Sequence, residues 1–231
     1  TLFATGSLRD LAAAFNREPE LFKSKVKRFY VNAGDTSGKI EWNVGLDPIA
    51  YQRILTSGLP IYWVPCFGEG GFASFWKFKQ GDILTNAPKP VQNFFLYMLT
   101  KSTVEDCIAA LNTEPDPDAM AKFWPEDRNM WCTAAFLDAA GRHPDASFSF
   151  SPHNVVMEPS GATHIAAEGA LTLNTFHVDA PNDYPVTMTK VLKEIVEQPV
   201  PAKVVLRQPL RAGFARTDVT PAVGMEIPGG F

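Results

Sequence analysis

The feature that most constrains the fold is the alternation of short apolar runs with amphipathic runs of helical period. Runs with strand character occupy residues 1–5, 27–32 and 59–67, and helical patterns occupy residues 8–16 and 47–56 between them. Strands that alternate with helices are typical of a parallel sheet, because each crossover helix packs back onto the sheet. The sequence therefore predicts an α/β fold, a mostly parallel open sheet with helices on both faces.

The rest of the chain has a less regular pattern. Residues 68–86 are rich in glycine and aromatic residues and predict a long loop, which is long enough to suggest a function. Further helical patterns lie at residues 91–101, 103–111, 129–140 and 182–198, and a β-like alternation lies at 146–178. Because residues 129–140 are nearly uncharged, we expect that helix to be buried.

Both ends of the sequence look cut. The first residues already have strand character, and the last residues fall within a turn-rich run. Three prolines soon after Gln198 predict a linker at residues 199–209. We therefore expect a slice of a longer polypeptide, with a body at residues 1–198 and with N-terminal strands missing.

Composition and charge narrow the classes of partner. The formal net charge of -4 argues against a nucleic-acid surface, which normally carries a basic stripe. No apolar run approaches the ~20 residues needed to span a bilayer. Cys66, Cys107 and Cys132 are far apart in the sequence, so neither a zinc site nor a disulfide framework is predicted. Nothing in the sequence indicates a compartment.

The triplet Glu41-Trp42-Asn43 is the strongest local indication of a binding site. We expect it in a loop, where an acid, an aromatic ring and an amide could bind vicinal hydroxyls beneath an aromatic wall. The alternative is a solvated loop that ends where Asp47 caps the next helix and Pro48 occupies its first position. The aromatic residues after residue 66 are equally open to two interpretations, a base-stacking lid and simple packing onto the core.

Short motifs in a fixed order strengthen the functional interpretation. The Thr5-Gly6 turn, the Glu41-Trp42-Asn43 triplet with Asp47-Pro48 after it, and Ser57-Gly58 before Pro60-Ile61 resemble the inosine–uridine-preferring nucleoside hydrolases. The resemblance covers about residues 1–198 and is clearest in the first third. It implies hydrolysis of the N-ribosyl bond of a small-molecule nucleoside, with Ca²⁺ binding the ribose hydroxyls and orienting the attacking water. It also allows a homo-oligomer.

The resemblance assigns roles to individual residues. Thr5 matches the threonine whose backbone carbonyl binds calcium. Glu41 and Asn43 match ribose-binding residues, Trp42 replaces the phenylalanine between them, and Asn32 falls where the sugar pocket is lined. These four residues are therefore the expected substrate-binding set.

Two departures from the family pattern affect the expected chemistry. The family's aspartate-rich calcium motif is absent from this sequence, and Asp35 is only the nearest polar residue to a further ribose-binding asparagine. Trp131 stands at the position of the leaving-group histidine, and Cys132 stands at the position of a calcium-binding aspartate. A thiol is a poor ligand for Ca²⁺, and an indole cannot protonate a leaving base. We therefore expect the chain alone to be inactive, and the alternative is a catalytically silent binding or structural module.

A second resemblance begins near the C-terminus. Residues 210–231, from Leu210-Arg211-Ala212-Gly213 onward, resemble the opening of the neutral/alkaline ceramidase-like domains. This implies a covalently attached ceramidase-like domain in the parent protein.

Overall fold

The computed structural model describes residues 1–100, 104–142, 147–169 and 171–198. The expected linker at 199–209 and the ceramidase-like stretch at 210–231 lie outside these residues. Within the described ranges, no helix combines the length and the apolar character needed to cross a membrane.

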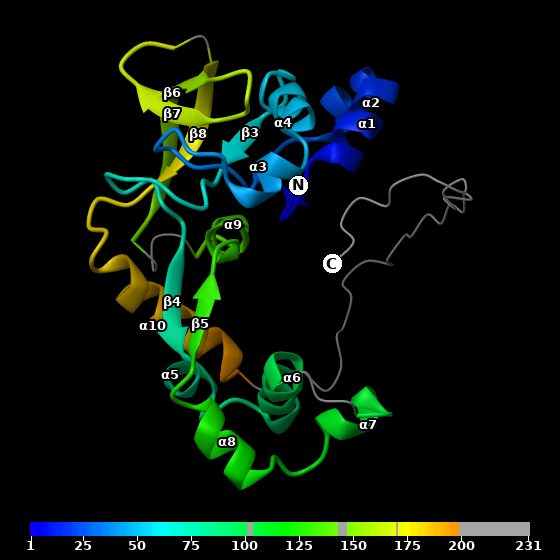
Figure 1. Cartoon of the computed structure of the whole chain (residues 1–231), viewed down its shortest axis with the longest axis vertical. Coiled ribbons are helices and arrows are strands. Elements are labelled where there is room, and N and C mark those ends of the chain that lie inside the picture. Colours follow the sequence, from blue (N-terminus) through cyan, green and yellow to red (C-terminus); the bar gives the residue numbers. More distant parts are fainter. Residues whose placement is uncertain (101–103, 143–146, 170, 199–231) are drawn as a thin grey trace. The chain divides into compact units, whose positions relative to one another are not determined.

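The larger of two sheets has six strands, and four of them are labelled in the upper half of Figure 1. Its order is β1-β2-β3-β8-β6-β7, with bounds Leu2–Ala4, Phe29–Val31, Ile61–Trp63, Leu171–His177, Ser149–Met157 and Thr163–Ala166. Strands β1, β2, β3 and β8 are parallel, whereas β6 runs antiparallel to both β8 and β7. The prediction of a mostly parallel sheet is confirmed, as is the β-rich segment that supplies β6, β7 and β8.

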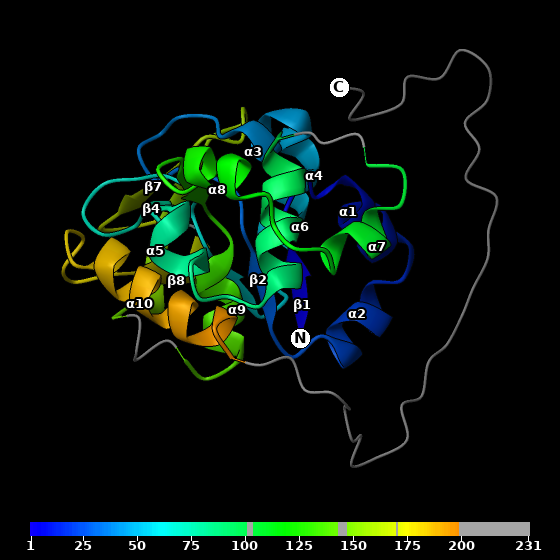
Figure 2. The same cartoon turned by 90° about the horizontal axis from the view of Figure 1, so that it is seen from below.

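Helices cover both faces of this sheet. Their bounds are Arg9–Arg17 (α1), Pro19–Lys25 (α2), Trp42–Leu46 (α3), Pro48–Leu55 (α4), Gln80–Leu84 (α5), Lys89–Thr100 (α6), Cys107–Leu111 (α7), Pro117–Phe123 (α8), Thr133–Ala139 (α9) and Tyr184–Val196 (α10). In both views α10 lies beside α5 (Figures 1 and 2).

The alternation of side chains along β2 produces two hydrophobic cores. Phe29 and Val31 point into one core, together with residues of α1 and α4. Tyr30 points into the other, together with residues of α9 and α10. All three side chains are fully buried, since successive residues of a strand point to opposite faces. This is why the strand has no polar face and reads as a continuous apolar run.

Local capping fixes the helix that follows the binding triplet. The Asp47 side chain accepts a hydrogen bond from Ala50 N at 2.9 Å, and Pro48 occupies the first turn of α4. Arg9 binds the other carboxylate oxygen of Asp47 at 2.8 Å and so joins α1 to the start of α4. The predicted start of this helix is therefore correct.

Two predictions in the middle of the chain are wrong. The expected loop at 68–86 contains strand β4, Trp76–Lys79, followed directly by α5. The expected helix at 129–140 begins only at Thr133, because the preceding residues form strand β5, Asp127–Met130, which pairs antiparallel with β4. Trp76 and Phe78 are buried while the two lysines beside them are exposed. One face of this short antiparallel pair of strands therefore packs against the core.

Candidate active site

The expected site residues converge on one cavity of about 310 Å³. Its lining comprises Thr5, Asn32, Glu41, Trp42, Asn43, Cys66, Phe67, Trp131 and Cys132. Thr5, Asn32 and Cys66 follow the carboxyl ends of the neighbouring parallel strands β1, β2 and β3. Ligands of open α/β sheets bind at this edge. The structure thus brings together the residues that the sequence selected for substrate, metal and leaving-group roles.

Glu41 is held more tightly than a loop residue. The predicted loop is wrong here, because Glu41 is the N-cap of α3 and is 6% exposed. Its carboxylate accepts hydrogen bonds from Gly34 N at 3.2 Å, from Val44 N at 3.4 Å and from the Asn43 side chain at 2.9 Å. These donors fix the orientation of the acid and of Asn43 toward the cavity before any ligand binds.

Gly34 connects the strand ends to Glu41. It donates to Glu41, and its carbonyl accepts from Cys66 N at 2.9 Å. With φ of 100°, Gly34 adopts a backbone conformation that side-chain-bearing residues avoid. A Cβ at this position would overlap the Tyr51 hydroxyl and would lie 3.1 Å from Trp63 Nε1. Sequence analysis missed this residue, although a glycine directly after a strand was a signal available to it.

Asn32 places a buried amide at the floor of the cavity. The residue is 1% exposed, and its side-chain nitrogen donates to the Ala4 carbonyl at 2.9 Å. That bond fixes the orientation of the amide, since the reverse orientation would put two acceptors face to face. Its oxygen has no hydrogen-bond partner among the described residues. Asp35 does not line the cavity, and its carboxylate instead accepts from the backbone and hydroxyl of Ser37 at 2.7 and 2.6 Å.

Aromatic side chains form much of the wall. Trp42 is 76% exposed, Phe67 40% and Trp131 36%. Phe75 lies behind the last two, with ring centroids 5.8 Å from Phe67 and 5.5 Å from Trp131. Of the aromatic residues after residue 66, Phe67 therefore lines the cavity, whereas Trp76 belongs to the core. Exposed aromatic faces beside a cavity are suited to flat ligands.

A buried polar cluster holds α9, the helix that follows Trp131 and Cys132. Asp138 of α9 accepts hydrogen bonds from Tyr30 and, at 3.1 Å, from Arg28. Arg28 also lies over the Tyr62 ring, 4.5 Å from its centroid. Burial, followed by the bond to Asp138, raises the pKa of Tyr30, which therefore remains a donor. Asp138 was the one acid in an otherwise uncharged predicted helix, and that was the signal for this contact.

Both thiols of the cavity are kept neutral. Burial is the largest cause that raises the pKa of Cys66, followed by the negative charge of Glu41. The same two causes raise the pKa of Cys132. Cys132 is the N-cap residue of α9, a position that favours a thiolate, but burial and Glu41 outweigh this, and no Lys, Arg or His is among the described residues that line the cavity. Their chemical contribution to the site is therefore that of small, weakly polar groups.

The residues of the cavity do not fit calcium. Ca²⁺ takes six to eight oxygen ligands, and the resemblance assigns one carbonyl oxygen to Thr5. Among the described residues of the lining Glu41 is the one carboxylate, and Cys132 offers a neutral sulfur. Across the described part of the chain, no three His, Cys, Asp or Glu residues are grouped so as to hold a metal.

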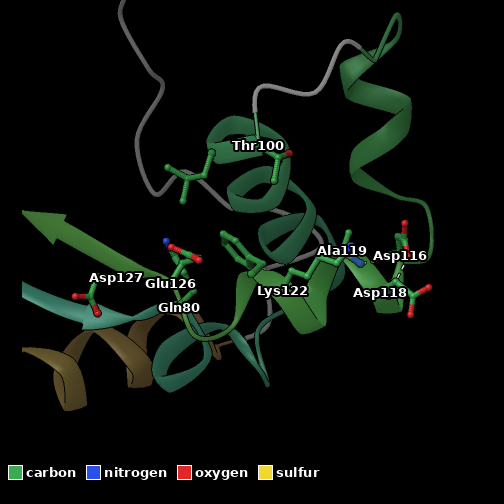
Figure 3. Close-up of a pocket in the computed structure, with 10 residues that line it drawn as sticks. Gln80, Thr100, Asp116, Asp118, Ala119, Lys122, Glu126 and Asp127 are labelled. Carbon is green, nitrogen blue, oxygen red and sulfur yellow. Dashed lines mark hydrogen bonds between the residues drawn. The ribbon is translucent and has the colours of Figure 1, made fainter.

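A larger cavity of about 590 Å³ lies elsewhere and has a different character. In Figure 3, Asp116 and Asp118 lie at one end of it, Glu126 and Asp127 at the other, and Lys122 between them. The Asp116 carboxylate caps α8 by accepting from Asp118 N, and Asp127 pairs with Lys77 and Lys79. Asp116 and Asp127 therefore already have structural partners, and none of the residues that the sequence selected lines this cavity.

The fold and the smaller cavity define an α/β protein with an aromatic-walled cavity at the carboxyl edge of its parallel strands. A family model described as inosine-uridine preferring nucleoside hydrolase matches residues 1–124, more than half of the chain. The chain belongs to that family. A comparison with curated proteins finds no match.

The family match covers only part of the residues that line the cavity. Residues from Thr5 to Phe67 of the cavity lie within it, and Trp131 and Cys132 lie beyond its end. The ceramidase-like resemblance at 210–231 has no support from the comparisons.

Proposed function

We propose that this protein binds the ribosyl group of an N-ribosyl compound in the Glu41 cavity and hydrolyses its N-glycosidic bond. The observation that carries the proposal is the fixed pair of Glu41 and Asn43 in a cavity at the strand edge, in a chain of the nucleoside hydrolase family.

Sugar recognition follows from the chemistry of this pair. Vicinal hydroxyls each offer one donor and two acceptor sites, so they are matched by a carboxylate that accepts and an amide that does both. Within the described part of the chain, Glu41 Oε1 accepts a hydrogen bond from Asn43 alone, so it retains room for a hydroxyl. Asn32 supplies a further acceptor at the floor of the cavity. The aromatic wall covers the flat part of the ligand.

In the reaction, the oxygen of water bonds to the anomeric carbon while the bond from that carbon to the base nitrogen breaks. The electron pair of the broken bond passes to the base nitrogen, which takes up a proton when the base is neutral, and the water loses one proton to solvent. The sugar passes through an oxocarbenium-like state, and a nearby negative charge stabilises it. Glu41 is the carboxylate that lines the cavity among the described residues. Its three N–H bonds hold it in place, so stabilisation needs no reorganisation during the reaction.

A second candidate is a binding module without turnover. The observation in its favour is Trp131, which lines the cavity where the resemblance expects a proton-donating histidine. A neutral base leaves poorly unless it is protonated, and general acid catalysis typically contributes ~10²–10⁴-fold.

The test uses the full chain with ribose, inosine and uridine, with calcium added and with a chelator. Isothermal titration calorimetry measures binding, and chromatographic detection of the free base measures hydrolysis. The informative variant is Asn43→Ala, because Asn43 is half-buried and, among the described residues, its side chain donates a hydrogen bond to Glu41 alone. Glu20→Gln, an exposed acid on α2, is the matched control.

Release of base by the wild type, lost in Asn43→Ala and retained in Glu20→Gln, is the result expected from this proposal, and it would overturn the expectation from the sequence that the chain alone is inactive. Binding of ribose without any release of base would favour the binding module. No binding of ribose or of either nucleoside would refute the assignment of the cavity.

A further inference from the structure

We propose that the preferred substrates carry a fixed positive charge on the base, as in N-ribosyl pyridinium compounds and quaternised purine ribosides. This inference rests on the proposed function and narrows its substrate class.

The first support is the pairing of aromatic faces with one carboxylate. Trp42, Phe67 and Trp131 line the same cavity as Glu41. Aromatic faces attract cations through their ring quadrupole, and tryptophan does so most strongly. Aromatic walls with a nearby carboxylate are therefore suited to a flat cation more than to a neutral ring of equal size.

The second support is the charge of the lining. Among the described residues that line the cavity, none is Lys, Arg or His, and Glu41 is the one formally charged member. Arg9, at the start of α1, is bound to Asp47 and to the Leu46 carbonyl, both at 2.8 Å. A cationic base would thus meet attraction from Glu41 without opposition from a basic side chain of the wall.

The third support is the chemistry by which the base leaves the sugar. When a neutral base leaves, its nitrogen must gain a proton, and the indole of Trp131 cannot supply one. When a cationic base leaves, the electron pair of the broken bond passes to the positively charged ring nitrogen, which becomes neutral. Water adds its oxygen to the anomeric carbon and releases one proton to solvent. Atoms and charge balance without any acid from the protein. The replacement of the family's histidine by Trp131 therefore does not hinder hydrolysis of this substrate class.

A matched pair of ligands isolates the charge. The compound 1-ribosyl-3-carbamoylpyridinium and its 1,4-dihydro form have nearly the same shape, but only the first is a cation. Titration calorimetry on the full chain should show the cation binding about fivefold to thirtyfold more tightly, the range expected for a partly desolvated cation–π contact. Chromatography should show release of neutral 3-carbamoylpyridine, at a rate well above the release of base from inosine.

Three variants locate the preference. Trp131→Leu should reduce it severalfold, whereas Trp131→Phe retains a ring and should retain most of it. Phe94→Leu removes an exposed aromatic side chain on α6, outside the cavity, and should leave the preference unchanged. Thermal unfolding of each variant confirms that it is folded.

The outcomes separate this inference from the function on which it rests. Equal binding of the cationic and dihydro forms, together with release of base from inosine, would overturn the charge preference and leave the proposed hydrolase standing. A preference that survives Trp131→Leu unchanged would also overturn it. If neither form binds and ribose does not bind, the proposed function itself fails.

Discussion

Replacing Gly34 by alanine should unfold the protein more easily and disturb the cavity at the same time. An L-residue at a φ of 100° costs about 1–2 kcal/mol. The new methyl group would overlap the Tyr51 hydroxyl and press on Trp63, which is fully buried and tied to the Ala33 carbonyl at 2.8 Å. Overpacking of this kind costs about 1–3 kcal/mol. The sum, about 2–5 kcal/mol, is a large part of the ~5–15 kcal/mol that stabilises a typical domain.

Urea unfolding followed by circular dichroism measures the loss, and the midpoint of thermal unfolding should fall by roughly 4–20 °C. Gly38→Ala is the matched control, since Gly38 has φ of 83° but nothing within 4 Å of its Cβ position. It carries the backbone cost alone, so the difference between the variants measures the overlap. If Gly34→Ala loses no more stability than Gly38→Ala, the packing around Tyr51 and Trp63 is not as tight as described.

Two further predictions concern the titration of Asp47 and the accessibility of the thiols. The Ala50 N–H and then Arg9 lower the pKa of Asp47 in the folded state. The ionised Asp47 carboxylate therefore stabilises the folded protein above the unfolded pKa of about 3.9. This stabilisation is lost as the pH falls through the lowered pKa. The difference in unfolding free energy between wild type and Asp47→Asn, up to about 1 kcal/mol at pH 7, should therefore shrink toward pH 3, and a difference independent of pH would contradict the coupling. With a chromogenic disulfide reagent, exposed Cys107 should react first and buried Cys66 only on unfolding, and Cys107→Ser should abolish the fast phase.

The parallel part of the sheet could be predicted because each of its strands is apolar on both faces, so neighbouring residues alone are enough to recognise it. Residues such as Phe29, Tyr30 and Val31 leave few alternatives to a buried strand. The β4–β5 ladder could not be predicted in the same way. Lys77 finds its partner Asp127 a full 50 positions away, and neither strand exceeds four residues. Pairing at that separation depends on tertiary packing, which local sequence patterns do not reveal.

The candidate site shows the same division. The strand ends at Thr5 and Asn32 followed from the fold class, since parallel strands share one carboxyl edge. The triplet at Glu41 was found by its chemistry, but its helical setting was missed because the five residues of α3 include weak helix formers such as glycine. What stabilises that turn is the Glu41 cap itself. The importance of Gly34 depends on side chains of β3 and α4, which no local pattern reveals.

The attachment of α9 has an evolutionary consequence. One wall of the cavity, Trp131 and Cys132, belongs to a segment whose tether to the sheet is the cluster of Asp138 with Tyr30 and Arg28. Under the proposed function, substitutions at Trp131 would change which base the cavity accepts, while the hydrogen bonds from Gly34, Val44 and Asn43 to Glu41 stay in place. Such a division would let specificity for the base change separately from binding of the sugar, so Trp131 is the position at which directed evolution should begin.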